Sequence, residues 1–153
     1  MNIVLVRVDS RLIHGQVVQG WLPSLSVQEV VVVSPSACES KLMCNMMRMS
    51  LPQAYSLKVL SPQQAAEYLK TEGDRKVFVI AEDLNSVFTL LQSGINFKEI
   101  TIGNTKYEDG KKQYAQGVFL SAQEVAELKE KAETFCVNFV IRTLPTSLST
   151  RLF

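Results

Sequence analysis

The chain has 153 residues, of which 46% are hydrophobic, and its 16 Lys and Arg residues nearly balance its 15 Asp and Glu residues. This length suits a single domain with one core, here expected to span residues 1–153. The charge balance argues against a nucleic-acid binder and against attachment to a membrane through basic residues. No apolar run reaches the roughly 20 residues of a membrane span, and the N-terminal run is too short for a secretion signal. We therefore expect a cytoplasmic protein.

The strand-length runs in this sequence are apolar and rich in Val, Ile and Phe, as strands tend to be. Several are almost unbroken, which is typical of strands buried on both faces of a parallel sheet. The predicted strands are residues 2–8, 29–34, 55–60, 76–81, 99–103, 117–121 and 136–141.

Helical segments separate most of these strands, and several begin with a capping box, in which a Ser side chain and a Glu or Gln three residues later satisfy free N–H groups. The predicted helices are Gln16–Leu22 ended by Pro23, a helix from the box at Ser36 to about Met49, a helix from Ser61 to about Thr71, Asp83–Gln92, and a helix from Ser121 to about Glu133. Alternation of strand and helix predicts an α/β domain with a mostly parallel sheet. Residues 100–121 are the exception, because two strand-like pieces joined by a polar loop predict a local antiparallel pair.

Two groups of sulfur-containing residues stand out. The cysteines Cys38, Cys44 and Cys136 form no CxxC pair and have no histidine near them, so neither a zinc site nor a disulfide framework is expected. No metal and no cofactor are expected. Four methionines between residues 43 and 49 could form an adaptable binding surface. Their helical spacing also fits packing, and we expect them to face the core.

The only histidine, His14, follows the first predicted strand in the stretch RVDSRLIHGQ, residues 7–16. Ligands of open parallel sheets bind beyond the carboxyl ends of the strands, so His14 is predicted at the functional edge. Arg11 can hold phosphate oxygens, and Asp9 can orient Arg11 or accept a hydrogen bond from the imidazole. Gly15 leaves room beside the ring, and the start of the next helix favours an anion. A neutral imidazole in this setting can accept a phosphoryl group.

The same residues also fit a loop histidine with only a structural role. Nothing else in the sequence decides between these two interpretations. There is no Gly-rich nucleotide loop, no HExxH or Cys/His metal cluster, and no GxSxG hydrolase motif.

The stretch RVDSRLIHGQVVQGW, residues 7–21, closely resembles the N-terminal active-site segment of the IIB subunits of the mannose-type sugar phosphotransferase system. This group includes proteins for mannose, fructose, sorbose and N-acetylgalactosamine. IGNTKYEDGKKQ, residues 102–113, and RTLP, residues 142–145, are similar to later segments of the family. The resemblance implies a three-layer α/β fold, with a mostly parallel sheet of about seven strands and helices on both faces.

In that family the loop histidine accepts a phosphoryl group from a phosphohistidine of a IIA partner. It then passes the group to a sugar bound by the membrane subunits IIC and IID. The resemblance therefore implies a cytoplasmic phosphotransferase component that associates peripherally with the IIC/IID complex. It implies that His14 is the phosphohistidine residue and that Arg11 contacts the phosphoryl group. The residues that match loop-organising or phosphate-binding positions are Asp9, Ser10, Gly15 and Gln16.

Two further residues are expected at the same edge on the strength of the resemblance. Asn104 lies in the Gly-Asn loop and Arg142 lies near the last predicted strand. The alternatives are a turn residue for Asn104 and a surface ion pair for Arg142. Trp21 is expected to pack behind the loop rather than to contact sugar.

The chain also departs from the family at several positions. Ser10 stands where members often carry an acidic residue, and residues 34–37 lack the acidic residues often found there. Thr105 and Lys106 replace a frequent Met-His pair. These differences keep open a second hypothesis, a regulatory or binding relative with altered catalysis.

A third hypothesis is a small-ligand or nucleotide-binding domain of flavodoxin-like plan. It is the weakest, because DSRLIHG is too bulky for a Gly-rich phosphate loop. The family is compatible with a homodimer. The sequence does not indicate the sugar, because the membrane subunits select it.

Overall fold

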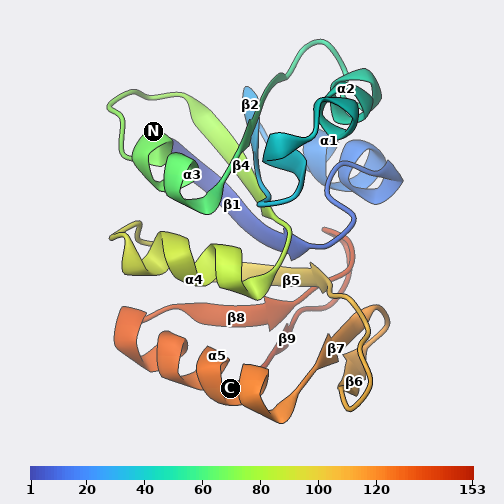
Figure 1. Ribbon diagram of the computed structural model, residues 1–153, viewed down its shortest axis with the longest axis vertical. Helices are drawn as coiled ribbons and strands as arrows, with labels where there is room; N and C mark the ends of the chain where they lie inside the picture. Colours follow the sequence, from blue (N-terminus) through green and yellow to red (C-terminus); the bar gives the residue numbers. More distant parts are fainter.

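A seven-stranded sheet runs through the molecule in the order β3-β2-β4-β1-β5-β8-β9 (Figure 1). The computed structural model describes all residues from 1 to 153. The strands from β3 to β8 are parallel, and β9 pairs antiparallel with β8. The strands are β1 (Asn2–Asp9), β2 (Glu29–Val33), β3 (Ser56–Leu60), β4 (Lys76–Ala81), β5 (Glu99–Asn104), β8 (Asn138–Ile141) and β9 (Thr150–Arg151).

Helices cover both faces of this sheet (Figure 1). One face carries α3 (Pro62–Leu69), α4 (Leu84–Gln92) and α5 (Ala122–Phe135), which pack into a core cluster of 25 buried residues. The other face carries the π-helix η1 (Val17–Trp21), α1 (Leu22–Ser24), the 3₁₀-helix η2 (Ala37–Glu39) and α2 (Lys41–Ser50), with a cluster of 13 buried residues. The expected three-layer α/β fold with a mostly parallel sheet of seven strands is confirmed. None of its helices has the length and apolar character needed to cross a bilayer.

Six of the seven predicted strands lie in the sheet, and the seventh does not. The run at residues 117–121 forms β7 (Val118–Leu120), which pairs antiparallel with β6 (Lys112–Ala115) in a separate hairpin. This confirms the local antiparallel pair. The seventh strand of the sheet is β9, which the sequence does not predict because two polar residues carry no strand pattern.

The helix after the first strand does not end at Pro23. It continues to Ser24, because a π-helical turn places the Leu22 N–H on the Val17 carbonyl and Pro23 then begins a new turn. A proline is tolerated there, since the first turn of a helix needs no backbone N–H.

The predicted capping box at Ser36 does not form. The Ser36 hydroxyl instead donates to Glu82 Oε1 at 2.8 Å, and the segment that follows is only a short 3₁₀ turn. The cap of α2 is Ser40, whose hydroxyl accepts from the Met43 N–H. Because Ser36 bonds to Glu82 instead of capping the helix, the cap of α2 lies four residues later, at Ser40.

The other helix starts are confirmed. Ser61 and Ser121 both form complete capping boxes, and Asp83 caps α4. α3 ends at Leu69, slightly before the predicted end, and α5 continues to Phe135.

The methionines of α2 do not face the core, and the expectation that they do is wrong for three of the four. Met47 is buried, whereas Met43, Met46 and Met49 are 37%, 59% and 85% exposed. Leu42 on the same helix is 70% exposed. Apolar spacing alone fits an inward or an outward stripe, and α2 turns only one row of side chains toward the sheet.

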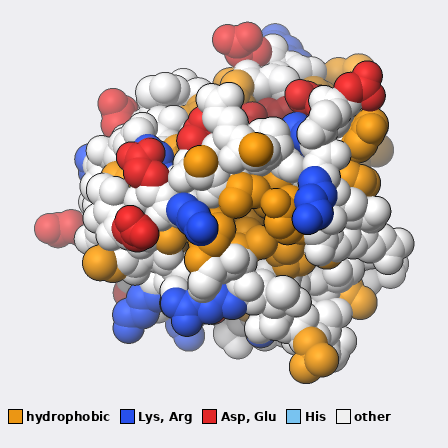
Figure 2. All heavy atoms as spheres, turned by 90° about the horizontal axis from the view of Figure 1, so that it is seen from below, with side chains coloured by type: hydrophobic (Ala, Val, Ile, Leu, Met, Phe, Trp, Pro, Cys, Tyr) orange, Lys and Arg blue, Asp and Glu red, His pale blue; other side chains and the backbone are white.

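A different apolar surface lies at the opposite end of the molecule. Figure 2 shows the face that carries α5 and the carboxyl terminus, where hydrophobic side chains gather in a hollow with Lys and Arg side chains beside it. α2 lies on the far side of the molecule from this view (Figure 1), so the two apolar surfaces are distinct.

Candidate active site

The site forms at the carboxyl end of β1, which lies in the sheet between β4 and β5. Successive side chains of a strand point to opposite faces. Val6 and Val8 therefore enter the larger core cluster, while Arg7 and Asp9 point to the face covered by η1 and α1. Both charged side chains are completely buried. Charged groups are rarely buried unless they are paired, so this pair needs partners.

Asp9 is the acceptor at the centre of the site. Its Oδ1 accepts hydrogen bonds from the backbone N–H and the Nε of Arg11, both at 3.0 Å. Its Oδ2 accepts from Arg11 Nη2 at 3.0 Å and lies 3.2 Å from His14 Nε2. Arg11 also donates to Gln16 Oε1 at 3.2 Å. One carboxylate therefore orients both the guanidinium and the imidazole, which are the two roles expected from the sequence.

The loop between β1 and the first helix is anchored by its apolar residues. The Leu12 N–H donates to the Asp9 carbonyl, and Leu12 adopts a left-handed φ of 60°. This conformation is uncommon for a residue with a branched side chain. Leu12 and Ile13 are buried in the cluster that contains Trp21. Neither faces outward, and the anchored loop leaves the His14 side chain 17% exposed.

Arg7 ties the site to the segment after β8. Its Nη1 and Nη2 donate to the carbonyls of Arg142 at 2.6 Å and Thr143 at 3.1 Å. Its guanidinium carbon lies 4.7 Å from the centre of the Trp21 ring, and Trp21 Nε1 also donates to the Thr143 carbonyl. A Cβ added to Gly103 would overlap this guanidinium, so only glycine fits beside Arg7. Trp21 packs behind the loop as expected.

Arg7 is a site residue that the sequence does not predict. The available signal was a charged residue inside an otherwise apolar strand, NIVLVRV. A lone buried charge is costly, so an arginine at such a position indicates a partner elsewhere in the chain.

The contacts around Asp9 keep it ionised. Burial alone raises the pKa of Asp9, but hydrogen bonds from His14 and Arg11 outweigh burial and lower that pKa from 3.8 to about 2. Burial lowers the pKa of Arg7 to about 10, and the nearby Asp9 carboxylate partly opposes this shift. Both groups are therefore charged near pH 7.

This lowered pKa gives the fold a defined acid dependence. The stabilisation from Asp9 is complete above its unfolded pKa of 3.8 and is lost as the pH falls through about 2. The shift corresponds to about 2 kcal/mol. We expect the difference in unfolding free energy between the wild type and Asp9→Asn to shrink by about that amount from pH 5 to pH 2. Urea unfolding at each pH measures it, and a difference independent of pH would contradict the assignment.

Ser10 and Asn104 meet across the edge of the sheet. Asp9 and Asn104 are aligned between β1 and β5, and the Ser10 N–H donates to the Asn104 carbonyl at 3.1 Å. Asn104 Nδ2 lies 3.5 Å from the Ser10 hydroxyl, and Asn104 Oδ1 is buried without a partner. Asn104 ends β5 rather than forming a turn.

Arg142 follows the end of β8, and its backbone N–H donates to the Ile102 carbonyl. Its side chain forms no ion pair, and its Nε is buried without an acceptor. The alternative of a surface ion pair therefore does not hold. Gly15 begins the next helix, and a Cβ there would meet nothing within 4 Å. The fold itself does not require glycine at that position.

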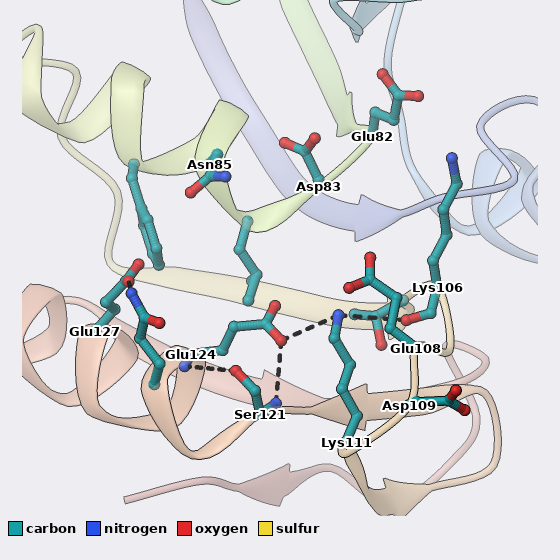
Figure 3. Close-up of a pocket in the computed structure, with 14 residues that line it drawn as sticks. Glu82, Asp83, Asn85, Lys106, Glu108, Asp109, Lys111, Ser121, Glu124 and Glu127 are labelled. Atoms are coloured by element: carbon teal, nitrogen blue, oxygen red, sulfur yellow. Dashed lines mark hydrogen bonds and ion pairs between the residues drawn. The ribbon is translucent and has the colours of Figure 1, made fainter.

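A polar cavity of about 530 Å³ opens at the same edge of the sheet but does not include His14 (Figure 3). It lies between the starts of α4 and α5 and the loop at residues 105–111. Most of its inner carboxylates already have partners: Asp83 caps α4, Glu82 accepts from two serines, and Glu124 pairs with Lys111 at 3.0 Å. Lys106 extends away from Lys111 and Glu124 (Figure 3).

No three His, Cys, Asp or Glu side chains lie close enough together to hold a metal ion.

Residues 3–152 match the family model described as PTS system sorbose subfamily IIB component. The chain belongs to this family. The resemblance of the His14 segment to IIB subunits is thereby confirmed, and membership places the chain in a sugar phosphotransferase system with a role in phosphotransfer.

Two curated relatives of this IIB component illustrate the match. The N-acetylgalactosamine-specific phosphotransferase enzyme IIB component 2 of Escherichia coli is 29% identical over 153 residues, covering 99% of this chain and 97% of the relative. The sorbose-specific EIIB component of Lacticaseibacillus casei is 29% identical over 132 residues, covering 85% and 80%.

Solved structures of other IIB components share the fold. The IIB domain of the sorbose permease from Klebsiella pneumoniae superposes with a TM-score of 0.91 at 25% identity, covering 99% of this chain and 94% of that chain. An N-acetylgalactosamine IIB component from Streptococcus pyogenes gives 0.89 at 28% identity, covering 97% and 91%.

Proposed function

We propose that this IIB component is a phosphocarrier. His14 accepts a phosphoryl group from a phosphorylated IIA protein and transfers it to a sugar held by the membrane subunits IIC and IID. The observation that carries this proposal is the contact between His14 Nε2 and Asp9 Oδ2 at 3.2 Å, within a site that also holds Arg11. A buried carboxylate behind a partly exposed imidazole leaves the outer nitrogen free to react.

The position of Asp9 determines which nitrogen reacts. An ionised carboxylate only accepts hydrogen bonds, so Nε2 of His14 carries the hydrogen and Nδ1 carries the lone pair. Nδ1 attacks the phosphorus as the N–P bond to the donor histidine breaks, and the donor ring recovers its electron pair. The phosphorylated His14 ring is then cationic, and the Asp9 carboxylate stabilises that charge.

Two guanidinium groups are available for the phosphoryl oxygens. Arg11 uses its Nε and Nη2 on Asp9 and Gln16, while its Nη1 makes no hydrogen bond. The Arg11 side chain is 39% exposed, so it can turn toward an incoming group. Arg142 contributes a second guanidinium without an anionic partner. Planar guanidinium groups suit phosphoryl oxygens because they donate two parallel hydrogen bonds.

The direct test of the phosphocarrier uses the fact that the chain has one histidine. Wild type and His14→Ala are incubated with labelled phosphoenolpyruvate, the general phosphotransferase components and the IIA protein. We expect acid-labile phosphate on the wild type and none on His14→Ala. A wild type that acquires no label, or a variant that acquires as much, contradicts the proposal.

The regulatory or binding relative is distinguished by the second half of the reaction. The labelled protein is mixed with membranes that contain IIC and IID and the sugar. Transfer of label to the sugar supports the phosphocarrier, whereas a protein that keeps its label is the regulatory relative.

Arg142→Gln is expected to slow phosphorylation of His14 by about 10- to 100-fold, because one donor to the phosphoryl oxygens is lost. Its stability should change little, since the Arg142 side chain makes no hydrogen bond or ion pair within the protein. Arg151→Gln is the matched control, because Arg151 pairs with Asn138 at the other end of β8. Initial rates from phosphorylated IIA measure both. An Arg142→Gln rate equal to the control excludes contact with the phosphoryl group.

A further inference from the structure

Arg7 is a completely buried arginine to which the proposed phosphoryl transfer gives no task. Removing one partner of a buried ion pair is strongly destabilising, because the other charge is left uncompensated. The pair as a whole adds little stability, since apolar side chains of similar volume often fill the same space as well or better. The contacts of Arg7 therefore indicate a role other than stability.

The guanidinium of Arg7 joins two parts of the site that are far apart in the sequence. On one side, Arg7 Nε lies 3.4 Å from Asp9 Oδ2, the same oxygen that lies 3.2 Å from His14 Nε2. On the other side, Nη1 and Nη2 donate to the carbonyls of Arg142 at 2.6 Å and Thr143 at 3.1 Å. Because a guanidinium is planar and rigid, it fixes the separation between the carboxylate behind the imidazole and the backbone of residues 142 and 143.

The backbone of Arg142 is held at both of its peptide groups. Its N–H donates to the Ile102 carbonyl at 3.2 Å, and its carbonyl accepts from Arg7. Since peptide groups are planar, these two bonds fix the direction in which the Arg142 side chain leaves the backbone. Residues 142–149 lie in no helix or strand, so no regular ladder of hydrogen bonds holds the Arg142 carbonyl in place of Arg7.

The surroundings of Arg7 hold its guanidinium in one position. The Trp21 ring lies 4.7 Å from the guanidinium carbon, and Trp21 Nε1 donates to the same Thr143 carbonyl that Arg7 uses. A Cβ at Gly103 would overlap the guanidinium, so the sheet leaves no spare space on that side. Arg7 is therefore a rigid support that has no surface for the donor protein to touch.

We propose that Arg7 is a positioning residue for the phosphoryl transfer, which sets where the Arg142 guanidinium lies relative to the His14 imidazole. This inference rests on the proposed function of His14 and on the proposed contact between Arg142 and the phosphoryl group. Arg7 acts through the backbone of residues 142 and 143 and touches no reacting atom. A shift of about 1 Å in a group that assists a reaction can lower the rate by about 100-fold, so this support determines rate rather than affinity.

The test is Arg7→Lys, because lysine keeps the positive charge but has no planar fork to span a carboxylate and two carbonyls. We expect the maximal rate of His14 phosphorylation by phosphorylated IIA to fall by about 10- to 100-fold. The concentration of phosphorylated IIA that gives half of this rate should stay within about twofold, since Arg7 is buried. Arg75→Lys is the matched control and should change neither value, because Arg75 pairs with Glu29 at the opposite end of the sheet.

The decisive measurement combines Arg7→Lys with Arg142→Gln. Where the Arg142 guanidinium is already absent, Arg7 has no guanidinium to place. We therefore expect Arg7→Lys to lower the rate by less than about threefold in the Arg142→Gln protein. A merely structural defect would lower the rate by the same factor in both proteins, and that result would overturn the inference. An Arg7→Lys rate equal to that of Arg75→Lys would overturn it as well.

Trp21→Phe tests the same connection without changing the buried charge, and it decides the question if Arg7→Lys does not fold. Phenylalanine keeps an aromatic ring near the guanidinium but loses the Nε1 donor to the Thr143 carbonyl. We expect the maximal rate to fall by about 3- to 10-fold, and this effect should disappear in the Arg142→Gln protein. Circular dichroism and urea unfolding show that each variant is folded.

The same experiments separate failure of this inference from failure of the proposed function. A wild type that accepts no phosphate contradicts the phosphocarrier, and the role of Arg7 falls with it. A wild type that is phosphorylated normally, with effects at residues 7 and 142 that simply multiply, contradicts only the positioning role of Arg7.

Discussion

Replacing Gly103 by alanine is expected to lower the free energy of unfolding by about 3 to 5 kcal/mol. The new methyl group would overlap the Arg7 guanidinium, which is completely buried and has no space into which to move. Displacing it would separate Arg7 from the carbonyls of Arg142 and Thr143 and leave a buried cation without acceptors. Urea unfolding at pH 7 measures the loss.

The matched control is Gly15→Ala. A Cβ at Gly15 meets nothing within 4 Å, and Gly15 is not among the residues with a left-handed φ. We expect a change of less than about 1 kcal/mol in the free energy of unfolding, because alanine also favours a helix start no less than glycine does. If Gly103→Ala is as stable as Gly15→Ala, the position of the Arg7 guanidinium does not depend on glycine at residue 103.

Asp9→Asn is expected to reduce the rate of His14 phosphorylation by about 100-fold or more. The amide carries no charge, so it does not stabilise the cationic ring that forms when Nδ1 takes the phosphoryl group. It also loses the two-oxygen contact with Arg11. The initial rate of label transfer from phosphorylated IIA measures the effect.

Asp83→Asn is the control for this change. Asp83 also follows a parallel strand at the same edge of the sheet, but it accepts only from the N–H and hydroxyl of Ser86. We expect its phosphorylation rate to equal that of the wild type. A near-normal rate for Asp9→Asn would show that His14 does not depend on the carboxylate.

The part of the site that the sequence could predict is local. Asp9, Arg11 and His14 lie within six residues, directly after an apolar run. The end of the strand, the loop and the start of the helix can therefore all be predicted from this short segment. Their mutual contacts need no information about the rest of the fold. The order of motifs in this short stretch also carried the family resemblance.

The part that could not be predicted depends on strand order. Arg7 contacts residues 142 and 143 because β1, β5 and β8 are neighbours in the sheet, although they are far apart in the sequence. The need for Gly103 follows from the same neighbourhood. No pattern in a single sequence states which strands will be adjacent.

The errors at α2 have a related cause. The residues Ser36 and Ser40 are equally good caps by local rules, and Glu82 on a neighbouring strand end removes the first from that role. The sequence correctly predicts a helix for the stripe of methionines but places three of the four on the wrong face. The spacing of apolar residues gives the width of an apolar stripe on a helix. Whether that stripe faces the core or the solvent depends on the elements that pack against the helix.

The bond between Arg7 and Thr143 also has a consequence for how the protein is made. The two residues are 136 positions apart, and a chain leaves the ribosome from its amino terminus. Arg7 therefore has no acceptor for its Nη2 until Thr143 has been synthesised. His14 is synthesised well before Thr143, so the support behind the imidazole is completed only after more than a hundred further residues have been added.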